Sequence, residues 1–273
     1  MTAATVSTTH GYDVVAPAYD LLTEGYAYGP WLRAIDRLAR EHGLPGRRAL
    51  DVACGTGKSL EALLDLGYDA LGCDGSAGMA AIAQAKLRDR TVVHVADMCE
   101  LPVYGRFDLV TCLDDAINHL ASADDVVAAL RAMAANLDAG GLVAFDVNTL
   151  SAYRDVGDRI VEDGDRIVLW HGRPARMDAP GGRAEVAMDV LSRCGDDLWR
   201  RTSASWGHWH YPLVAIPALA AAAGLAVVAV RGQRVGGRLE ADADEERHRK
   251  AVFLARRDDR NGGRDDALAA VDR

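Results

Sequence analysis

The chain has 273 residues, of which 49% are hydrophobic, and a formal net charge of -9. That length accommodates one large domain, or one domain with a sizeable insertion, and the apolar fraction is enough for a full core. The acidic balance argues against a general nucleic-acid partner, and no apolar run is long enough to span a membrane. The cysteines are widely spaced and form no C-x-x-C pair, which indicates buried free thiols and favours a cytoplasmic protein.

The first residues are expected to form helices that precede the sheet. Tyr12 and Tyr19 are seven positions apart, a spacing that places both on one face of a helix. These tyrosines either pack against the domain or belong to a lid over a ligand site. Pro30 suits the first turn of a second helix, and Gly43 ends it. We therefore expect residues 1–45 to be an N-terminal helical lid segment.

The string DVACGTGKS, which starts at Asp51, joins a short buried strand to a helix. Its glycines let a ligand approach the backbone, and the free amides at the helix start favour a charged ligand. A phosphate-binding loop needs glycine where Val52 stands, and a dinucleotide fingerprint needs glycine where Leu60 stands. The third candidate is S-adenosylmethionine, whose amino-acid end lies against a D-x-x-x-G-x-G turn, here Asp51, Gly55 and Gly57. A turn with no ligand is the alternative.

From residue 47 onward the sequence alternates between strand and helix patterns. Strands are expected at 48–52, 68–73, 91–96, 107–113 and 142–147. The clearest helices are expected at 77–87 and 123–137. This alternation predicts a parallel sheet with helices on both faces. Ligands bind outside the carboxyl ends of the strands in such sheets, so the residues at those ends are the candidates for a site.

Acidic residues follow four successive strands. Asp74 comes about 20 positions beyond the glycine turn, where a carboxylate can accept both hydroxyls of a ribose. Asp97 can accept a hydrogen bond from an exocyclic amine, and the thioether of Met98 can pack on an aromatic base. The fourth strand leads into Asp114 and Asp115, and the fifth ends at Asp146. A single aspartate at a strand end is more often a helix cap, but four in succession indicate a ligand site.

The ordered strings DVACGTGKS, GCD, ADM and FDLV resemble the motifs of class I S-adenosylmethionine-dependent methyltransferases. The resemblance implies a seven-stranded Rossmann-like methyltransferase sheet, with residues 46–150 as the S-adenosylmethionine-binding core. It implies the glycine turn near the methionine part of the cofactor, Asp74 on the ribose, and Asp97 with Met98 at the adenine. The full expected cofactor set is Asp51, Gly55, Gly57, Asp74, Asp97, Met98 and Leu113.

Two shorter strings narrow the resemblance. YDLLTEG, which starts at Tyr19, and NHL, which starts at Asn118, are similar to segments of the amino-sugar N-methyltransferases of antibiotic biosynthesis. In that group the position of His119 lies beside the substrate amine, so His119 and Tyr19 are the expected catalytic residues. Where that group has a small uncharged run, this chain has an acidic pair that suits a cationic substrate. The expected substrate-binding residues are Tyr12, Asp114, Asp115 and Asn118.

The pattern changes after the fifth strand. Three segments alternate like antiparallel strands and are separated by glycine and proline turns, at 159–170, 183–193 and 197–211. We expect a small antiparallel β-insertion over residues 151–211, which either covers the substrate or forms a dimer interface. His208 and His210 share a strand face in this insertion, but no third ligand is evident nearby, so no metal is expected.

The rest of the sequence returns to the core pattern. Residues 212–257 are expected to supply the last helix of the core and two further strands, at 225–230 and 250–255. The charged tail at 258–273 is expected to be solvated. The whole chain is thus expected to be an α/β protein in which the β-insertion interrupts a Rossmann-like sheet.

Taken together, these features predict N-methylation of a small amine-bearing metabolite or natural product by S-adenosylmethionine. A small-molecule O-methyltransferase and a non-catalytic S-adenosylmethionine-binding module are the alternatives. The expected partner is the small-molecule amine, with no nucleic acid and no membrane, and a homodimer is one role for the insertion.

Overall fold

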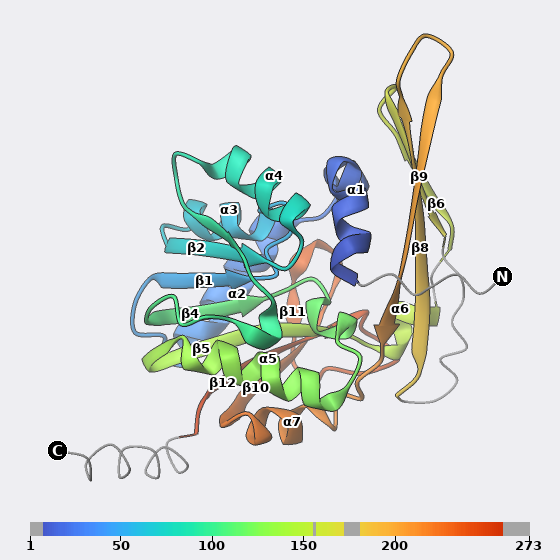
Figure 1. The fold of residues 1–273 in the computed structure, drawn as a ribbon. Helices are drawn as coiled ribbons and strands as arrows, with labels where there is room; N and C mark the ends of the chain where they lie inside the picture. The colour runs from blue at the N-terminus through green and yellow to red at the C-terminus, as the bar shows by residue number, and fades with distance from the viewer. Residues whose placement is uncertain (1–7, 155–156, 172–180, 259–273) are drawn as a thin grey trace.

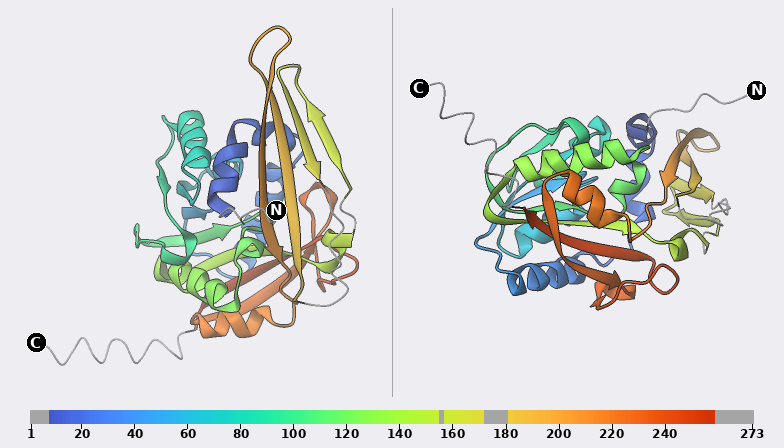
Figure 2. Two further views of the ribbon diagram at one scale, coloured as in Figure 1. Left: turned by 45° about the vertical axis from the view of Figure 1, so that its right-hand side comes forward. Right: turned by 90° about the horizontal axis from the view of Figure 1, so that it is seen from below.

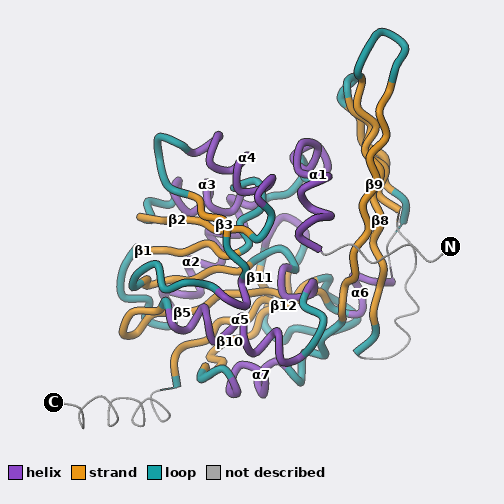
Figure 3. The backbone as a smooth tube through the Cα atoms, viewed as in Figure 1, coloured by secondary structure: helices purple, strands orange, loops and turns teal. Residues whose placement is uncertain are grey.

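The computed structural model describes residues 8–154, 157–171 and 181–258. The tail expected at 258–273 lies outside the described residues except for Asp258. Figure 1 shows a central sheet with helices on both sides and a second, narrow sheet that projects beside it. Figure 3 shows the alternation of strands and helices in the central part of the chain. None of the helices in the described ranges is long and apolar enough to cross a membrane.

The central sheet contains the seven expected strands and one more. Its order is β11-β10-β12-β5-β4-β1-β2-β3. Neighbouring strands from β3 to β5 are parallel, whereas β12, β10 and β11 join in antiparallel pairs. The additional strand is the two-residue edge strand β11. In chain order the strands are β1 (Arg48–Val52), β2 (Asp69–Asp74), β3 (Val93–Val95), β4 (Phe107–Cys112), β5 (Leu137–Asn148), β10 (Leu225–Gln233), β11 (Leu239–Glu240) and β12 (Lys250–Arg257).

Helices cover both faces of this sheet, with α2, α3 and α4 packed on one face and α5 and α7 on the other. The helix expected to reach residue 137 ends at Ala135, because Asn136 caps it and β5 begins at Leu137. The helices are α1 (Thr8–Leu22), α2 (Tyr28–Glu41), α3 (Lys58–Asp65), α4 (Ala77–Leu87), α5 (Ala123–Ala135), α6 (Leu150–Arg154) and α7 (Ile216–Ala222), with short 3-10 turns η1 (Met98–Glu100), η2 (Ala116–His119) and η3 (Val235–Gly237).

The strands at the centre of the sheet are buried on both faces. Leu50 and Val110 belong to the cluster under α5, whereas Ala49 and Leu109 belong to the cluster under α2 and α3. This two-sided burial explains why these strands are continuous apolar runs. The carboxyl ends of the parallel strands therefore meet at one edge of a rigid core, where polar side chains can be held in place.

The insertion is a separate antiparallel sheet of four strands, in the order β6-β7-β8-β9. One strand was expected at 159–170, but Gly164 adopts a φ of 88° there and the segment folds back as a hairpin. The strands are β6 (Arg159–Glu162), β7 (Arg166–His171), β8 (Arg183–Arg193) and β9 (Trp199–Trp209). Apolar residues of this sheet, including Val186 and Trp206, pack against Val15 and Leu22 of α1. Figure 2 shows this sheet standing beside α1.

Candidate functional site

The glycine turn joins β1 to α3 and requires its glycines. Gly55 and Gly57 have φ values of 56° and 90°, in the left-handed region that glycine adopts at little cost. A Cβ atom at Gly57 would also lie 3.1 Å from side-chain atoms of Ala83 and Leu87. The amide of Gly55 donates a hydrogen bond of 2.8 Å to Oδ2 of Asp74. The turn is thereby fixed against the end of the neighbouring strand β2.

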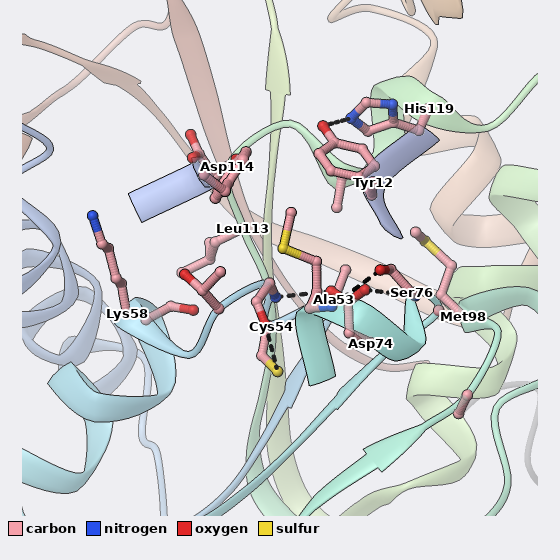
Figure 4. A pocket seen from close by; sticks show the side chains of 18 of the residues that line it. Tyr12, Ala53, Cys54, Lys58, Asp74, Ser76, Met98, Leu113, Asp114 and His119 are labelled. Atoms are coloured by element: carbon pink, nitrogen blue, oxygen red, sulfur yellow. Dashed lines mark hydrogen bonds between the residues drawn. The ribbon is translucent and has the colours of Figure 1, made fainter. Parts of the chain in front are cut away.

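A pocket opens above this turn, at the carboxyl ends of the parallel strands (Figure 4). Figure 4 shows Tyr12 and His119 side by side at the upper edge of the pocket, with Asp74 and Met98 below them. Nine of the residues expected from the sequence line the pocket, namely Tyr12, Tyr19, Gly55, Asp74, Asp97, Met98, Leu113, Asp114 and His119.

The carboxylates expected to contact ribose and adenine are held by backbone amides. Oδ1 of Asp74 accepts a hydrogen bond of 2.8 Å from the amide of Ser76, while its Oδ2 is held by the glycine turn. Burial raises the pKa of Asp74, and these backbone hydrogen bonds oppose that rise. Asp97 caps η1 by accepting a 2.8 Å hydrogen bond from Cys99. Each carboxylate keeps lone pairs for a ligand.

Two residues of the expected cofactor set, Asp51 and Gly57, do not line the pocket. Asp51 is 1% exposed and accepts hydrogen bonds of 2.6 Å from the hydroxyls of Ser59 and Thr111. Burial raises the pKa of Asp51 to about 6. Asp51 therefore lies beneath the turn and links β1 to α3 and β4, while Gly57 supplies the backbone conformation at the start of α3.

Helix α1 covers the pocket, and its two tyrosines line it. Asp13 accepts a hydrogen bond of 2.6 Å from the hydroxyl of Ser76, and Asp20 accepts one of 2.6 Å from Thr56. Lys86 forms an ion pair with Asp20 as well. These contacts hold α1 against the start of α4 through Asp13 and against the glycine turn through Asp20. Sequence reasoning missed these anchors, although Asp20 lies in the string that starts at Tyr19.

Asp114 and Asp115 are paired with a protein cation that sequence reasoning also missed. Nζ of Lys250 lies 2.7 Å from Asp114, 2.8 Å from Asp115 and 3.2 Å from Asp146. Burial opposes charge on Lys250, but the carboxylates raise its pKa well above the ordinary value. The hydroxyl of Tyr28 donates a further hydrogen bond of 2.7 Å to Asp114. Three carboxylates around one ammonium leave this corner of the pocket negatively charged.

His119 is partly buried beside two aromatic neighbours. Its Nε2 lies 3.0 Å from the hydroxyl of Tyr12 and 3.2 Å from Nε2 of His208. Burial lowers the pKa of His119 well below its usual value, and His208 and Lys250 lower it further. At neutral pH the imidazole is therefore uncharged.

Asn118 is fully buried, and it does not line the pocket. Its Nδ2 donates a hydrogen bond of 2.8 Å to the carbonyl of Trp209, and its Oδ1 accepts one of 2.8 Å from the amide of Asn148. These bonds tie η2 to β9 and β5. Asn118, which was expected to bind the substrate, thus fixes the segment that carries His119.

A second, open groove of about 840 Å³ adjoins the pocket. Tyr12, Tyr19, Tyr28 and Asp114 line both spaces. Strands of the insertion and the loop before β12 supply other walls of the groove, including Trp170, Glu185, His208, Arg247 and Lys250. Asp115 faces this groove rather than the pocket. The groove brings the insertion and the core together around one rim.

Comparisons with known proteins agree with this arrangement. Residues 49–141 match the family described as the methyltransferase domain. The dTDP-3-amino-3,6-dideoxy-alpha-D-glucopyranose N,N-dimethyltransferase of Streptomyces fradiae is 37% identical over 134 residues, which are 48% of this chain and 52% of that protein. A putative methyltransferase of Geobacillus sp. (strain WCH70) is 33% identical over 142 residues, 50% of this chain and 58% of that protein. The chain thus spans about half the length of these curated relatives.

Solved structures match over most of the chain. The sugar N-methyltransferase KedS8 from Streptoalloteichus sp ATCC 53650 has 27% sequence identity and a TM-score of 0.70, with 94% of this chain and 96% of that chain covered. An S-adenosylmethionine-dependent methyltransferase from Clostridium acetobutylicum ATCC 824 has 21% identity and a TM-score of 0.73, with 90% and 98% covered. At 21% identity, the second match shows only that the two proteins share a fold.

The fold is the one seen in solved S-adenosylmethionine-dependent methyltransferases, and the pocket lies at the carboxyl ends of its parallel strands. Residues 49–141 are a methyltransferase domain, and the chain resembles sugar N-methyltransferases of antibiotic pathways. The expected Rossmann-like sheet with a β-insertion after the fifth strand is confirmed, and the match to the methyltransferase domain agrees with the expected cofactor, S-adenosylmethionine.

Proposed function

We propose that this protein transfers a methyl group from S-adenosylmethionine to the amino group of a small molecule, with an amino sugar as the substrate class. One observation carries the proposal: the inner pocket and the open groove share the rim made by Tyr12, Tyr19, Tyr28 and Asp114. Methyl transfer is a displacement that depends on holding two reactants in line. A rim common to two adjoining spaces is the arrangement that such a reaction requires.

The lining of the inner pocket fits the cofactor. S-adenosylmethionine, when bound, supplies an electrophilic methyl group on a sulfonium ion. The glycine turn at Gly55 offers its backbone to the methionine end. Asp74 is held with its oxygens at the pocket, where it can accept ribose hydroxyls, and Met98 can pack against the adenine. Helix α1 covers these groups and separates them from bulk water.

The charge at the rim favours an amine over a phenol or an alcohol as acceptor. Asp114, Asp115 and Asp146 surround Lys250, so an excess of negative charge lies beside the pocket. An ammonium group is attracted to this region, whereas a neutral hydroxyl gains little. The names of the sugar N-methyltransferases among the similar proteins support the same choice.

We propose that the acceptor nitrogen arrives beside His119 and Tyr12, which both line the inner pocket. The nitrogen forms its new bond to carbon with a lone pair, so an ammonium acceptor must first lose a proton. Nε2 of His119 and the hydroxyl of Tyr12 form a contact of 3.0 Å in the pocket wall. We propose that this pair orients the acceptor and receives the proton. Tyr19 lies beside Tyr12, with ring centroids 5.9 Å apart, and completes the aromatic wall.

The test has two stages. Calorimetry first measures S-adenosylmethionine binding, and release of S-adenosylhomocysteine is then measured with amino sugars, nucleotide-linked amino sugars, other primary amines and phenols. We expect binding and turnover with at least one amino sugar. Turnover with phenols alone would replace the proposal by O-methylation. Cofactor binding without turnover on any acceptor would indicate a non-catalytic binding module.

We further propose that the four-stranded insertion covers the acceptor, because Trp170, Glu185 and His208 line the groove. Its second proposed role, a homodimer interface, is measured by light scattering coupled to size-exclusion chromatography. A monomer at working concentration would remove that role. Location in the cytoplasm is also part of this proposal, and cell fractionation tests it.

A further inference from the structure

Two side chains around η2, Asp115 and His119, and one side chain of the insertion, His208, come together between the inner pocket and the groove. His119 lies on η2, His208 lies on β9, and Asp115 precedes η2. Each offers one ligand atom, and these atoms lie within 4.8 Å of one another. We propose that they form a binding site for a divalent transition-metal ion of the Zn²⁺, Co²⁺ or Ni²⁺ type. The proposal rests on this geometry and not on the proposed function.

The spacing of the two imidazoles suits a shared ion. Nε2 of His119 and Nε2 of His208 are 3.2 Å apart. An ion about 2.1 Å from each of two nitrogens, with a bond angle near tetrahedral or octahedral, separates them by roughly 3.0–3.4 Å. Two imidazoles and one carboxylate are a mixed donor set that favours these metals over Mg²⁺ or Ca²⁺.

The elements that carry the histidines are fixed relative to each other. Asn118 precedes His119, Trp209 follows His208, and Asn118 donates a 2.8 Å hydrogen bond to the carbonyl of Trp209. This bond holds η2 in register with β9. The site therefore needs little rearrangement to bring both imidazoles to one ion, which reduces the cost of binding.

Asp115 is oriented by its other partners. Its Oδ1 accepts the hydrogen bond from Lys250 at 2.8 Å, and its Oδ2 lies 3.6 Å from Nδ1 of His208. Asn148 donates a 2.9 Å hydrogen bond to the same Oδ2. The carboxylate thus presents one oxygen to the ammonium and the other to Asn148 and the imidazole ring of His208.

The surroundings also favour a cation. Three carboxylates lie within 3.2 Å of Lys250, which gives this cluster an excess of negative charge, although Arg247 and Arg249 line the same groove. His208 and Asp115 line the open groove, which gives an ion a path from solvent. The competing explanation is a hydrogen bond between the two imidazoles, with one proton between the Nε2 atoms; that arrangement predicts no saturable metal binding.

The sequence offered a different histidine pair. His208 and His210 share a strand face, but Nε2 of His210 lies 3.0 Å from Glu245, and its ring is fully buried in that contact. The partner of His208 is instead His119, 89 residues away. His210 therefore serves as a matched control, because it is a buried histidine at the same end of the insertion.

The experiment titrates chelator-stripped, full-length protein with Co²⁺, followed by visible absorption, and with Zn²⁺, followed by calorimetry. We expect one ion per chain with a dissociation constant in the micromolar range or below. His208→Asn is expected to weaken binding by more than the roughly 10–100-fold that loss of an outer-shell partner costs. His210→Asn is expected to stay within a few-fold of the wild type.

No saturable binding by the wild type, or equal affinity in wild type and His208→Asn, would overturn the proposal. Melting curves show whether each variant is folded. If His208→Asn does not fold, the metal affinity of His119→Asn is measured instead, because that variant removes the other imidazole. The same loss of affinity is then expected.

An ion on Nε2 of His119 would occupy the lone pair that the proposed function uses. Resting on that function, we expect zinc-loaded protein to methylate its acceptor at least tenfold more slowly than stripped protein. Equal rates in the two forms would contradict this inhibitory effect. Failure of the stripped protein to methylate any acceptor would count against the proposed function, and the binding titration would still decide the metal site.

Discussion

The hydroxyl of Tyr12 lies 3.0 Å from Nε2 of His119, although 107 positions separate the two residues. This contact joins the N-terminal helix α1 to η2, which follows the fourth strand of the core. Trp206 of the insertion packs on Tyr12, with ring centroids 4.8 Å apart. Three parts of the chain that are distant in sequence therefore meet at the rim of the cofactor pocket.

Removing the imidazole of His119 should slow methyl transfer. We expect His119→Ala to lower kcat by about 10²–10⁴-fold, the usual range for loss of a general acid or base. The dissociation constant of S-adenosylmethionine is expected to change little, because the expected cofactor contacts lie in the glycine turn, at the end of β2, around η1 and directly after β4. Steady-state kinetics and calorimetry measure the two quantities. His42→Ala, at the end of α2, is the control. A rate within a few-fold of the wild type would mean that catalysis depends on proximity alone.

Replacing the carboxylate at the end of β2 should weaken the binding of S-adenosylmethionine. Asp74→Asn keeps the size of the side chain but removes the charge that accepts ribose hydroxyls. A hydrogen bond to a charged group contributes about 1.5–3 kcal/mol, so S-adenosylmethionine affinity should fall by roughly 10–150-fold. Calorimetry measures this loss. Asp69→Asn, at the exposed start of the same strand, is the matched control, and equal affinities in the two variants would contradict the assignment.

Alanine substitutions at two glycines separate the cost of a steric clash from the cost of backbone strain. Gly57 and Gly67 both have positive φ, 90° and 81°, so alanine is strained at either position by about 1–3 kcal/mol. A Cβ at Gly57 lies 3.1 Å from Ala83, whereas a Cβ at Gly67 has nothing nearer than 3.9 Å. Gly57→Ala should therefore be the more destabilising, as measured by urea unfolding. Equal free energies of unfolding would show that α4 moves aside without cost.

Stability should depend on pH through Asp51. Burial raises its pKa to about 6, so the folded protein binds this proton more tightly than the unfolded chain does. The contribution to the free energy of unfolding is therefore largest below about pH 4 and is lost as pH rises through 6. One pKa unit corresponds to about 1.4 kcal/mol, which gives about 3 kcal/mol over that range.

Asp51→Asn should remove the share of this dependence that Asp51 contributes, because the amide does not titrate, whereas Asp146, whose pKa burial also raises to about 6, keeps its own share. Urea unfolding at a series of pH values measures the slope, and Asp197→Asn in the exposed turn between β8 and β9 is the control. A variant with the same pH slope as the wild type would contradict the assignment to Asp51.

Lys250 should contribute more to the free energy of unfolding than a surface lysine does. Lys250→Met leaves three carboxylates without their cation in a partly buried cluster. Removing one partner from a buried ion pair costs about 3–5 kcal/mol. Lys250→Arg keeps the charge and should retain most of the stability. Chemical unfolding compares the two variants, and similar losses in both would mean that the shape of the lysine matters rather than its charge.

Local patterns predicted the elements that position the site. The alternation of strand and helix signals gave the parallel part of the sheet, and the glycine spacing gave the turn above which the pocket opens. Asp74, Asp97 and Met98 were found because each follows a strand, and parallel strands end at one edge of a sheet. These features depend on residues that are neighbours in sequence.

Contacts between distant residues were not predictable in the same way. Lys250 begins a strand that was expected at 250–255, but no local pattern shows that it pairs with Asp114 and Asp115. Asp51 fits the cofactor motif, but its hydrogen bonds to Ser59 and Thr111 place it below the pocket. The hairpin at Gly164 was also missed, because the polar and apolar residues of its two short strands alternate in the way expected of a single strand.

The sequence by itself determined the class of sheet, the position of the glycine turn and the acidic strand ends, because backbone conformation and burial follow from short-range spacing. Only the tertiary structure decided what surrounds the acceptor. Antiparallel strands and an N-terminal helix fold back over the rim, so His208 reaches His119 and Lys250 offsets part of the acidic charge. Such charge and hydrogen-bond partners depend on packing between segments, which no local pattern encodes.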